Sequence, residues 1–408
     1  MKLLVFAHTP PPHHGQSYGV QRMLQGFGGD RHRRKRDTAG APPDRFDIEC
    51  YHVNARFSRD LKDIGSFRGG KFFQLFGYCL QAVWWRFRYG VTNFYYVPAP
   101  GEPSAVYRDW LVMFLCRPFF RKTIFHWHAA GLLEWLETTA SACVRKLTHQ
   151  LMGNPDVSIV ASEFNWRDAE KFHSRRIFVV SPGVPDPCPR FETEILRARQ
   201  AKTAARQKIL LGRVAETNPA DATVNVLYLA LCTREKGVFD TVEGVALANE
   251  QYAAKKFPLR FKLTLVGTFA STAEETELRE WIERRGLRND MECLGFVSEE
   301  RKAQALAQAD LFCFPTYYHA ESFGAVIVEA MAFGLPVITT RWRSIPEILT
   351  PDYPGFVDPK SPSQIAEALQ RLAGLDLAKS LRETFVRRFT LEHHLAGLAE
   401  AIHSAEKS

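Results

Sequence analysis

The segment with the most evident chemistry is FPTYYHAESFGAVIVEAMAFGLPVITT, residues 314–340. Glu321 lies in the loop after a predicted strand, and Gly324 leads into a helix that is apolar on almost every side. Such a helix is predicted to be buried, and the amides of its first turn have no partners within the helix. Its N-terminus would suit an anion such as a diphosphate, which Gly324 would let approach the backbone.

Glu329 is an anomaly within this apolar helix. A buried carboxylate is costly unless it is hydrogen-bonded, and the 2′,3′-diol of a ribose offers two donors in one place. A buried ion pair with an arginine is the alternative. Glu321 also has a second explanation, because an acid at a helix start gains roughly 0.3–1 kcal/mol from the helix dipole without any ligand.

Two histidines, His126 and His128, stand at the end of a predicted strand, and their alternate spacing directs both side chains to one face. On the residues alone, each is an ordinary core or rim histidine, since the pair lacks a third ligand for zinc. His8, His13 and His14 could also bind metal, but no carboxylate or cysteine spacing supports such a site. No metal is therefore predicted.

The elements that must position these residues alternate between short β-branched or aromatic runs and longer amphipathic segments. This alternation predicts an α/β protein with two doubly wound parallel sheets, whose ligands would collect at the carboxyl ends of the strands. The first series of predicted strands covers 2–7, 46–53, 93–99, 123–127, 157–161 and 176–180, and the second covers 224–231, 261–267, 291–295, 309–315 and 335–340.

The length of 408 residues suits two or three domains. We predict an N-terminal domain over 1–183, a linker or insertion over 184–222, a C-terminal domain over 223–376 and a C-terminal helix over 377–408 that could pack back on the first domain. The linker is inferred from a stretch rich in Pro, Arg, Ala and Thr that holds no apolar strand.

Charge is shared unevenly along the chain. Residues 1–184 hold 25 Lys/Arg and 15 Asp/Glu, a balance of +10, whereas the remainder holds 28 and 30, a balance of −2. The opening run MKLLVFA is too short for a signal-peptide core, and no apolar stretch approaches the roughly 18 residues needed to cross a bilayer. We therefore expect a cytoplasmic protein whose basic half faces an anionic partner.

The pattern Glu-Ser-Phe-Gly-Ala-Val-Ile-Val-Glu-Ala-Met-Ala-Phe-Gly-Leu-Pro-Val-Ile resembles, nearly residue for residue, the signature of family 4 of the retaining glycosyltransferases. The resemblance implies the GT-B fold, in which two Rossmann-like domains face each other across a cleft. It also implies that Glu321 contacts the donor sugar near its reacting centre and that Glu329 binds the nucleotide ribose. The backbone of Phe323, Gly324 and Ala325 would then hold the diphosphate.

The segment LYLALCTREKGVFD, residues 227–240, is similar to the first strand and turn of the nucleotide domain in that family. Lys236 matches the phosphate-binding lysine. The family usually has an arginine five residues earlier, where this chain has Leu231, and Arg234 could supply the missing charge or point to solvent.

Weaker similarities imply further donor contacts. Gly267 in LVGTF, and Phe296 and Val297 in CLGFVSEE, resemble the loops that border the base, and Gly15 in TPPPHHGQSYG resembles the loop facing the donor phosphates. This chain has Gly-Gln where family members often carry two adjacent glycines. The resemblance also favours His128 as the residue beside the reacting sugar and leaves His126 structural.

The resemblance implies a retaining transfer from a nucleotide diphosphate sugar to a glycan or lipid-linked sugar, in polysaccharide or glycoconjugate synthesis. The sequence holds no Asp-x-Asp pair, so phosphate charge would be met by cations and amides without a divalent metal or another cofactor. A nucleotide-sugar epimerase and a non-catalytic partner subunit stay open as alternatives. No nucleic-acid partner is predicted, since the aromatic residues form no recognised motif.

Two segments of the basic half mix Phe, Trp and Tyr with Arg and Lys, namely 67–90 and 107–122. Basic residues can engage anionic headgroups while aromatic rings rest at the interface, so these segments could dock the domain peripherally on the inner face of a membrane. The alternative is that the aromatic residues form the core faces of two helices.

Overall fold

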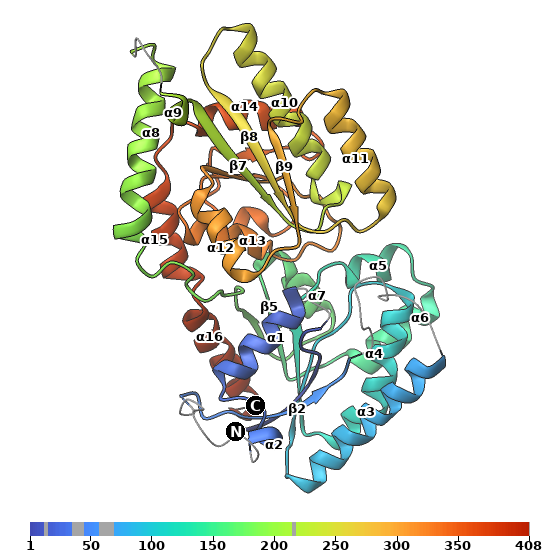
Figure 1. The fold of residues 1–408 in the computed structure, drawn as a ribbon. Helices are drawn as coiled ribbons and strands as arrows, with labels where there is room; N and C mark the ends of the chain where they lie inside the picture. The colour runs from blue at the N-terminus through green and yellow to red at the C-terminus, as the bar shows by residue number, and fades with distance from the viewer. Residues whose placement is uncertain (12–14, 35–44, 57–68, 214–217, 408) are drawn as a thin grey trace. The chain divides into compact units, whose positions relative to one another are not determined.

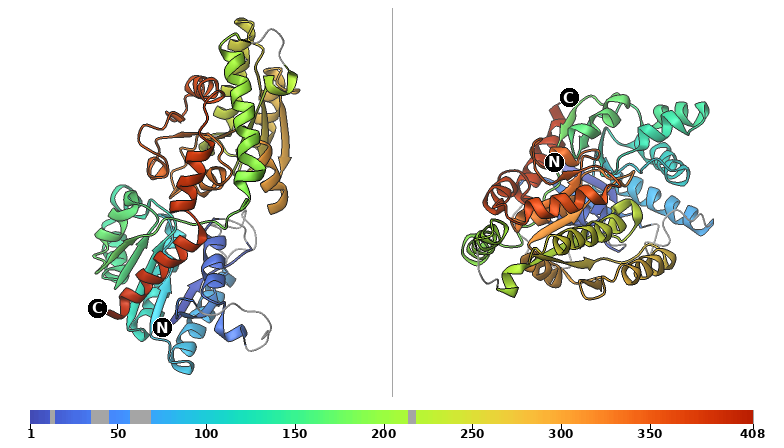
Figure 2. Two further views of the ribbon diagram at one scale, coloured as in Figure 1. Left: turned by 90° about the vertical axis from the view of Figure 1, so that its left-hand side faces the viewer. Right: turned by 90° about the horizontal axis from the view of Figure 1, so that it is seen from above.

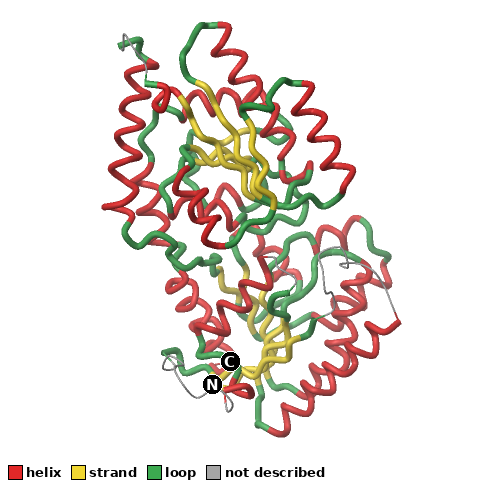
Figure 3. The backbone as a smooth tube through the Cα atoms, viewed as in Figure 1, coloured by secondary structure: helices red, strands yellow, loops and turns green. Residues whose placement is uncertain are grey.

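The computed structural model describes residues 1–11, 15–34, 45–56, 69–213 and 218–407 (Figure 1). These residues form two compact units, each described here by itself. Unit 1 comprises Met1–Gly183 and Leu391–Ser408, and unit 2 comprises Val184–Thr390. Each unit contains a six-stranded parallel sheet accompanied by helices, as the strands and helices of Figure 3 show.

The sheet of unit 1 has the strand order β2-β1-β3-β4-β5-β6, and every pairing is parallel. Most residues of its strands are buried, because helices cover both faces and the strands are accordingly apolar runs. The strands are β1 (Lys2–Ala7), β2 (Glu49–Asn54), β3 (Asn93–Tyr96), β4 (Lys122–Trp127), β5 (Val157–Val160) and β6 (Ile177–Val179).

Alternate residues of β1 enter two different cores, as the period of a strand requires. Leu4 and Phe6 pack with residues of α3 and α4, whereas Leu3 and Val5 pack with residues of α1 and α16. The helices of unit 1 are α1 (Gly15–Gly26), α2 (Arg31–Arg34), α3 (Gly69–Arg88), α4 (Pro103–Cys116), α5 (Leu132–Thr138), α6 (Ala142–Met152), α7 (Trp166–Lys171) and α16 (Leu391–Ser404).

The last helix, α16, completes the core of unit 1 although it is the most distant in sequence. It packs on β5 and α1, and Figure 2 shows this C-terminal helix beside the N-terminal segment. The helices approach so closely that a Cβ added at Gly26 would lie 2.3 Å from the Leu395 side chain. Both ends of the chain therefore belong to one unit.

The sheet of unit 2 has the order β12-β11-β10-β7-β8-β9, again with every pairing parallel. Its outer strand β9 is largely exposed, whereas β10 and β11 are buried throughout. The strands are β7 (Thr223–Leu229), β8 (Arg260–Val266), β9 (Met291–Gly295), β10 (Leu311–Phe314), β11 (Val337–Thr340) and β12 (Phe356–Val357). The helices are α8 (Arg197–Leu210), α9 (Pro219–Ala222), α10 (Val238–Ala254), α11 (Thr272–Arg284), α12 (Glu299–Gln308), α13 (Ala325–Ala332), α14 (Pro362–Leu372) and α15 (Ala378–Arg388).

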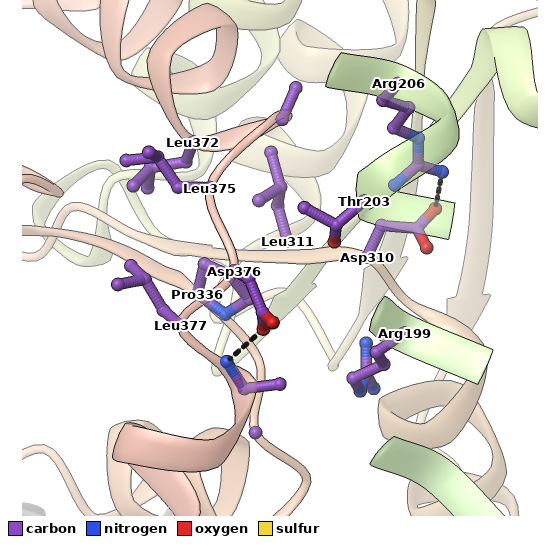
Figure 4. Close-up of a pocket in the computed structure, with 13 residues that line it drawn as sticks. Arg199, Thr203, Arg206, Asp310, Leu311, Pro336, Leu372, Leu375, Asp376 and Leu377 are labelled. Carbon is purple, nitrogen blue, oxygen red and sulfur yellow. Dashed lines mark hydrogen bonds and ion pairs between the residues drawn. The ribbon is translucent and has the colours of Figure 1, made fainter. Parts of the chain in front are cut away.

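In the structure, the predicted linker over 184–222 and the predicted domain over 223–376 belong to one unit, which begins at Val184. Helix α8 lies inside that linker and packs on unit 2, where buried Arg206 donates to the Asp310 carboxylate at 2.7 Å. Arg199 donates to the Ala309 carbonyl at 2.6 Å, and both arginines border a small cavity of about 20 Å³ (Figure 4). Both arginines face inward and donate to groups just before the start of β10. The polar composition of this segment predicted a linker, whereas the segment forms a packed helix.

The predicted α/β class with two doubly wound parallel sheets is confirmed. Each predicted apolar run coincides with a strand, with bounds that differ by a few residues. The structure adds β12, which consists of Phe356 and Val357 only and is too short to produce a sequence pattern.

Two buried histidines, His394 of α16 and His126 of β4, lie with ring centroids 6.4 Å apart. His394 bonds the Ser181 carbonyl through Nδ1 at 2.9 Å, and burial lowers the pKa of His394 to about 4. His126 bonds the Tyr95 hydroxyl, and burial followed by the nearby His128 and His394 holds the pKa of His126 well below its usual value. Both imidazoles are therefore neutral in the folded protein near pH 7.

We expect unit 1 to lose stability in acid through His394. In the unfolded chain its pKa is near the ordinary value of about 6.5, so the unfolded state takes up a proton first as the pH falls. The substitution H394N keeps an N–H for Ser181 and cannot titrate. The unfolding free energy of wild type should fall relative to H394N by up to about 3 kcal/mol between roughly pH 6.5 and pH 4, measured by urea denaturation. Parallel pH profiles for the two proteins would contradict this assignment.

Candidate functional site

The carboxyl edge of the unit 2 sheet carries the predicted site residues at a topological switch point. From β7 the chain proceeds outward through β8 and β9, and from the neighbouring β10 it proceeds the opposite way through β11 and β12. Crevices between such divergent loops are where open α/β sheets bind ligands. The two loops contact directly here, because the Tyr317 amide donates to the Glu235 carbonyl at 2.7 Å.

Lys236 and Glu321 meet at this point, although 85 positions separate them in sequence. The Lys236 Nζ lies 2.6 Å from the Glu321 Oε2, and their side chains are only 19% and 11% exposed. The approach depends on Gly237, which has φ +81° and where a Cβ would lie 2.5 Å from the Pro315 carbonyl oxygen. A side chain at Gly237 would therefore push the two loops apart.

Glu321 makes further contacts that fix its carboxylate. Its Oε1 accepts a hydrogen bond from the Gly324 amide at 3.2 Å, and its Oε2 lies 3.5 Å from the Thr316 hydroxyl. The ammonium of Lys236 also lies over the Tyr318 ring, 4.5 Å from its centroid. Glu321 thus bonds the amide at the start of α13, as an acid at a helix N-terminus is expected to do, and also neutralises a lysine.

The N-terminus of α13 presents backbone rather than side chains. Gly324 has φ +69° and precedes the helix, which starts at half-buried Ala325. The Phe323 side chain is buried, and its ring contacts that of Phe389 with centroids 5.9 Å apart. Only the backbone of Phe323 could contact a ligand, and the first-turn amides with the helix dipole favour an anion here.

Glu329 lies in α13 and its side chain is 14% exposed. Its Oε1 lies 3.0 Å from the Nζ of Lys302 in α12, which also pairs with Glu299 at 2.8 Å. Burial lowers the pKa of Lys302, but the two carboxylates outweigh it and the pKa is raised overall. Glu329 therefore forms the buried ion pair that the sequence left open as an alternative, but its partner is a lysine and not an arginine.

Arg234 is engaged elsewhere than at the Lys236–Glu321 pair. Its guanidinium pairs with Glu277 of α11 and lies 4.0 Å from the Phe239 ring centroid, while its amide donates to Glu274. The arginine side chain is 48% exposed. In this arrangement Arg234 does not place a second positive charge beside Lys236 to replace the family arginine, whose position is Leu231 here.

The loops after β8 and β9 continue the same edge of the sheet. The Gly267 amide donates to the Gly295 carbonyl at 2.9 Å, and a Cβ at Gly267 would lie 1.8 Å from the Ala230 carbonyl oxygen. Phe296 is 71% exposed, and Val297 is half-buried beside it. The structure thus brings Gly267, Phe296 and Val297 to one edge of unit 2, where the Phe296 ring is available to stack on a planar group.

In unit 1, His128 directly follows β4 and its ring lies 4.0 Å from that of buried His126. Gly15 begins α1 and is exposed, and Gly19 one turn later would place a Cβ 3.1 Å from the His128 ring. Helix α1 therefore packs against His128 at the carboxyl edge of the sheet. His13 and His14 lie outside the described residues.

Sequence reasoning missed three residues of these arrangements: Lys302, Tyr318 and Gly19. Lys302 lies on a different helix from Glu329, and no local pattern connects them. Tyr318 could have been noticed as an aromatic residue within FPTYYHAES, and Gly19 as a glycine four positions after Gly15 on the same helix face. Among the described residues, no group of three His, Cys, Asp or Glu is placed to hold a metal ion.

Comparison with known proteins finds similarity to a family within unit 2. Residues 215–388 match the family model described as "Glycosyl transferases group 1". The putative colanic acid biosynthesis glycosyltransferase WcaL of Escherichia coli is 27% identical over 193 residues, 44% of this chain and 45% of the relative. The phosphatidyl-myo-inositol mannosyltransferase of Mycobacterium leprae is 36% identical over 114 residues, 28% and 29% of the two chains. The matched region thus spans less than half of either relative.

Solved structures resemble the whole chain. Anabaena HepE in complex with UDP and glucose matches with a TM-score of 0.64 at 17% identity, covering 99% of this chain and 100% of the other. A sucrose-phosphate synthase from Thermosynechococcus elongatus matches with a TM-score of 0.67 at 18% identity, covering 99% of each chain. At such identities the likeness shows the fold, which is GT-B with two Rossmann-like sheets.

Proposed function

We propose that the chain is a glycosyltransferase that moves a sugar from a nucleotide diphosphate sugar to a glycan or lipid-linked acceptor, in polysaccharide or glycoconjugate synthesis. The observation that carries the proposal is the Lys236–Glu321 pair beside the N-terminus of α13, at the switch point of a parallel sheet. This arrangement lies within the region that matches the family model. The likeness to WcaL supports the polysaccharide assignment.

The proposed chemistry follows from where charge develops. As the nucleoside diphosphate leaves, negative charge gathers on its β-phosphate, and Lys236 with the first amides of α13 would stabilise it. Glu321, fixed by Gly324 and Thr316, would lie beside the sugar, which becomes oxocarbenium-like. We propose retention by same-face attack, since no separate carboxylate nucleophile is assigned, and His128 as the residue of unit 1 beside the reacting sugar.

One observation favours a second candidate, a non-catalytic partner subunit. Leu231 replaces the family arginine, and Arg234 pairs with Glu277 instead of lying beside Lys236. Incubation with a panel of uridine, guanosine, adenosine and thymidine diphosphate sugars separates the candidates. Slow donor hydrolysis supports a transferase, epimer formation supports an epimerase, and binding without either supports a partner subunit.

The two glutamates should affect different kinetic parameters. Because Glu329 is proposed to bind the ribose, E329A should raise the KM for the donor, whereas E321A should mainly lower kcat. K302A is the matched control, since it removes the other half of the ion pair. If E329A and K302A lower stability equally and leave KM unchanged, Glu329 is a structural residue only.

Lys236 should matter far more than Arg234. K236A removes a preorganised contact to the leaving phosphate and should lower kcat/KM by about 100-fold or more. R234A removes a half-exposed ion pair and should stay within about threefold of wild type. Initial rates with the identified donor test both, and E277A serves as a control that releases Arg234. A loss in R234A as large as that in K236A would mean that Arg234 turns from Glu277 to the donor.

Activity should persist in excess EDTA, because the proposed phosphate contacts are a lysine and backbone amides and the sequence has no Asp-x-Asp pair. Rates of donor turnover before and after dialysis against EDTA give the measurement. Complete loss that manganese restores would reveal a metal site and overturn this part of the proposal.

A further inference from the structure

Helix α3 exposes a continuous apolar stripe along its outer side. Phe73, Phe76, Leu80, Trp84 and Phe87 are 79%, 41%, 56%, 64% and 67% exposed. At 100° per residue these five positions fall within an arc of roughly 80° and span about 21 Å of the helix. The core alternative weighed from the sequence thus holds for one face of α3 only, and the exposed face leaves the docking prediction open. Its opposite face is the core face, where Leu75, Cys79, Ala82 and Trp85 are buried.

The stripe continues onto the end of α4 and the single turn at Arg117–Phe119. The rings of Phe87 and Phe119 are in edge contact with centroids 6.1 Å apart, and Arg86 donates to the Phe119 carbonyl at 2.8 Å. Phe119 and Phe114 are themselves 44% and 67% exposed. Figure 1 shows α3 on the outside of unit 1, next to α4. We call these seven exposed residues of α3, α4 and the following turn the aromatic face.

The charge around the aromatic face is predominantly positive. Residues 69–133 contain seven Lys/Arg and two acidic residues, Glu102 and Asp109. Asp109 is fully buried and bonds the Tyr96 hydroxyl at 2.7 Å, so it contributes little to the surface. Beside Phe114 opens a hollow of about 630 Å³ whose charged lining residues are Arg117, Arg121, Lys122, Asp156 and Arg175.

We propose that the aromatic face docks unit 1 on an anionic lipid bilayer, with α3 lying in the plane of the interface and the basic hollow meeting lipid phosphates. Large aromatic rings flanked by an excess of Lys/Arg over acidic residues suit the headgroup region of such a membrane. A second copy of this chain suits the face less well, because a two-fold contact would bring the same basic residues together. None of the described helices is long and apolar enough to span a bilayer.

The placement of α3 gives docking a direction. The helix connects β2 to the parallel strand β3, so it runs opposite to the strands and its first residues lie near their carboxyl ends. His128 follows β4 at that same edge. A bilayer along α3 would therefore pass close to the edge that carries His128, where a lipid-linked acceptor could be reached. This last step rests on the proposed function, whereas the docking itself rests on unit 1 alone.

Flotation of the full chain with vesicles tests the docking without any donor. The vesicles are phosphatidylcholine alone or phosphatidylcholine mixed with phosphatidylglycerol, each at low and high salt. We expect binding to the anionic vesicles at low salt and release at high salt. F73E/W84E, with both changes on exposed rings, should bind at least about tenfold more weakly. L211E is the matched control, since Leu211 is 61% exposed on unit 2, and it should bind like wild type.

Two results would overturn the docking proposal. One is wild-type protein that stays unbound with anionic vesicles at low salt, and the other is F73E/W84E that binds as well as L211E. Sedimentation velocity tests whether a second copy of the chain covers the aromatic face instead. If the wild-type protein self-associates and F73E/W84E does not, the face is assigned to a second copy. Circular dichroism and thermal shifts with nucleotide diphosphates show whether each variant is folded and keeps donor binding. Loss of vesicle binding with donor binding intact thus separates this inference from the proposed transferase activity.

Discussion

The arrangement of unit 2 depends on the contact between the loop after β7 and the loop after β10. These strands are neighbours in the sheet although more than eighty residues separate them, and Gly237 lets the two loops touch at the Pro315 carbonyl. That contact brings a lysine and a glutamate to 2.6 Å, and the glutamate accepts a hydrogen bond from the Gly324 amide at the start of α13. Every proposed role for Lys236, Glu321 and the backbone near Gly324 requires this approach.

Both glutamates for which a ligand-binding role is proposed form ion pairs in the structure. A buried ion pair gains little net stability, because the desolvation of both charges offsets their attraction. The Lys236–Glu321 and Lys302–Glu329 pairs do, however, keep four charged groups ordered in an apolar setting. An arriving phosphate or ribose would find its partners already positioned, and it would have to compete with the internal partner of each. On the proposed assignment, the affinity for a donor would reflect the difference between these two sets of electrostatic contacts.

Local patterns predicted the sheets and the position of Glu321 before a helix, because strands and helix starts are encoded by neighbouring residues. The apolar runs that became β1 to β11 are of this kind, and so is the Glu321–Gly324 turn before α13. Contacts between distant segments were not predictable: Lys302 reaches Glu329 from another helix, and Arg234 turns to Glu277 on α11. Helix α8 was predicted to be a linker because a sequence does not show whether an arginine is buried or exposed. Only the hydrogen bonds to Asp310 and Ala309 show that the arginines of α8 are packed inside unit 2.

The return of α16 to the first unit has a consequence for synthesis on the ribosome. Unit 2 occupies one continuous stretch, Val184–Thr390, whereas unit 1 needs residues from both ends of the chain. The face of the first sheet that α1 shares with α16 stays incomplete until Leu395, Leu398 and Ile402 have been made and released from the exit tunnel. Unit 1 is thus started before unit 2 and completed after it, and the apolar surface awaiting α16 is what a chaperone would meet on the nascent chain.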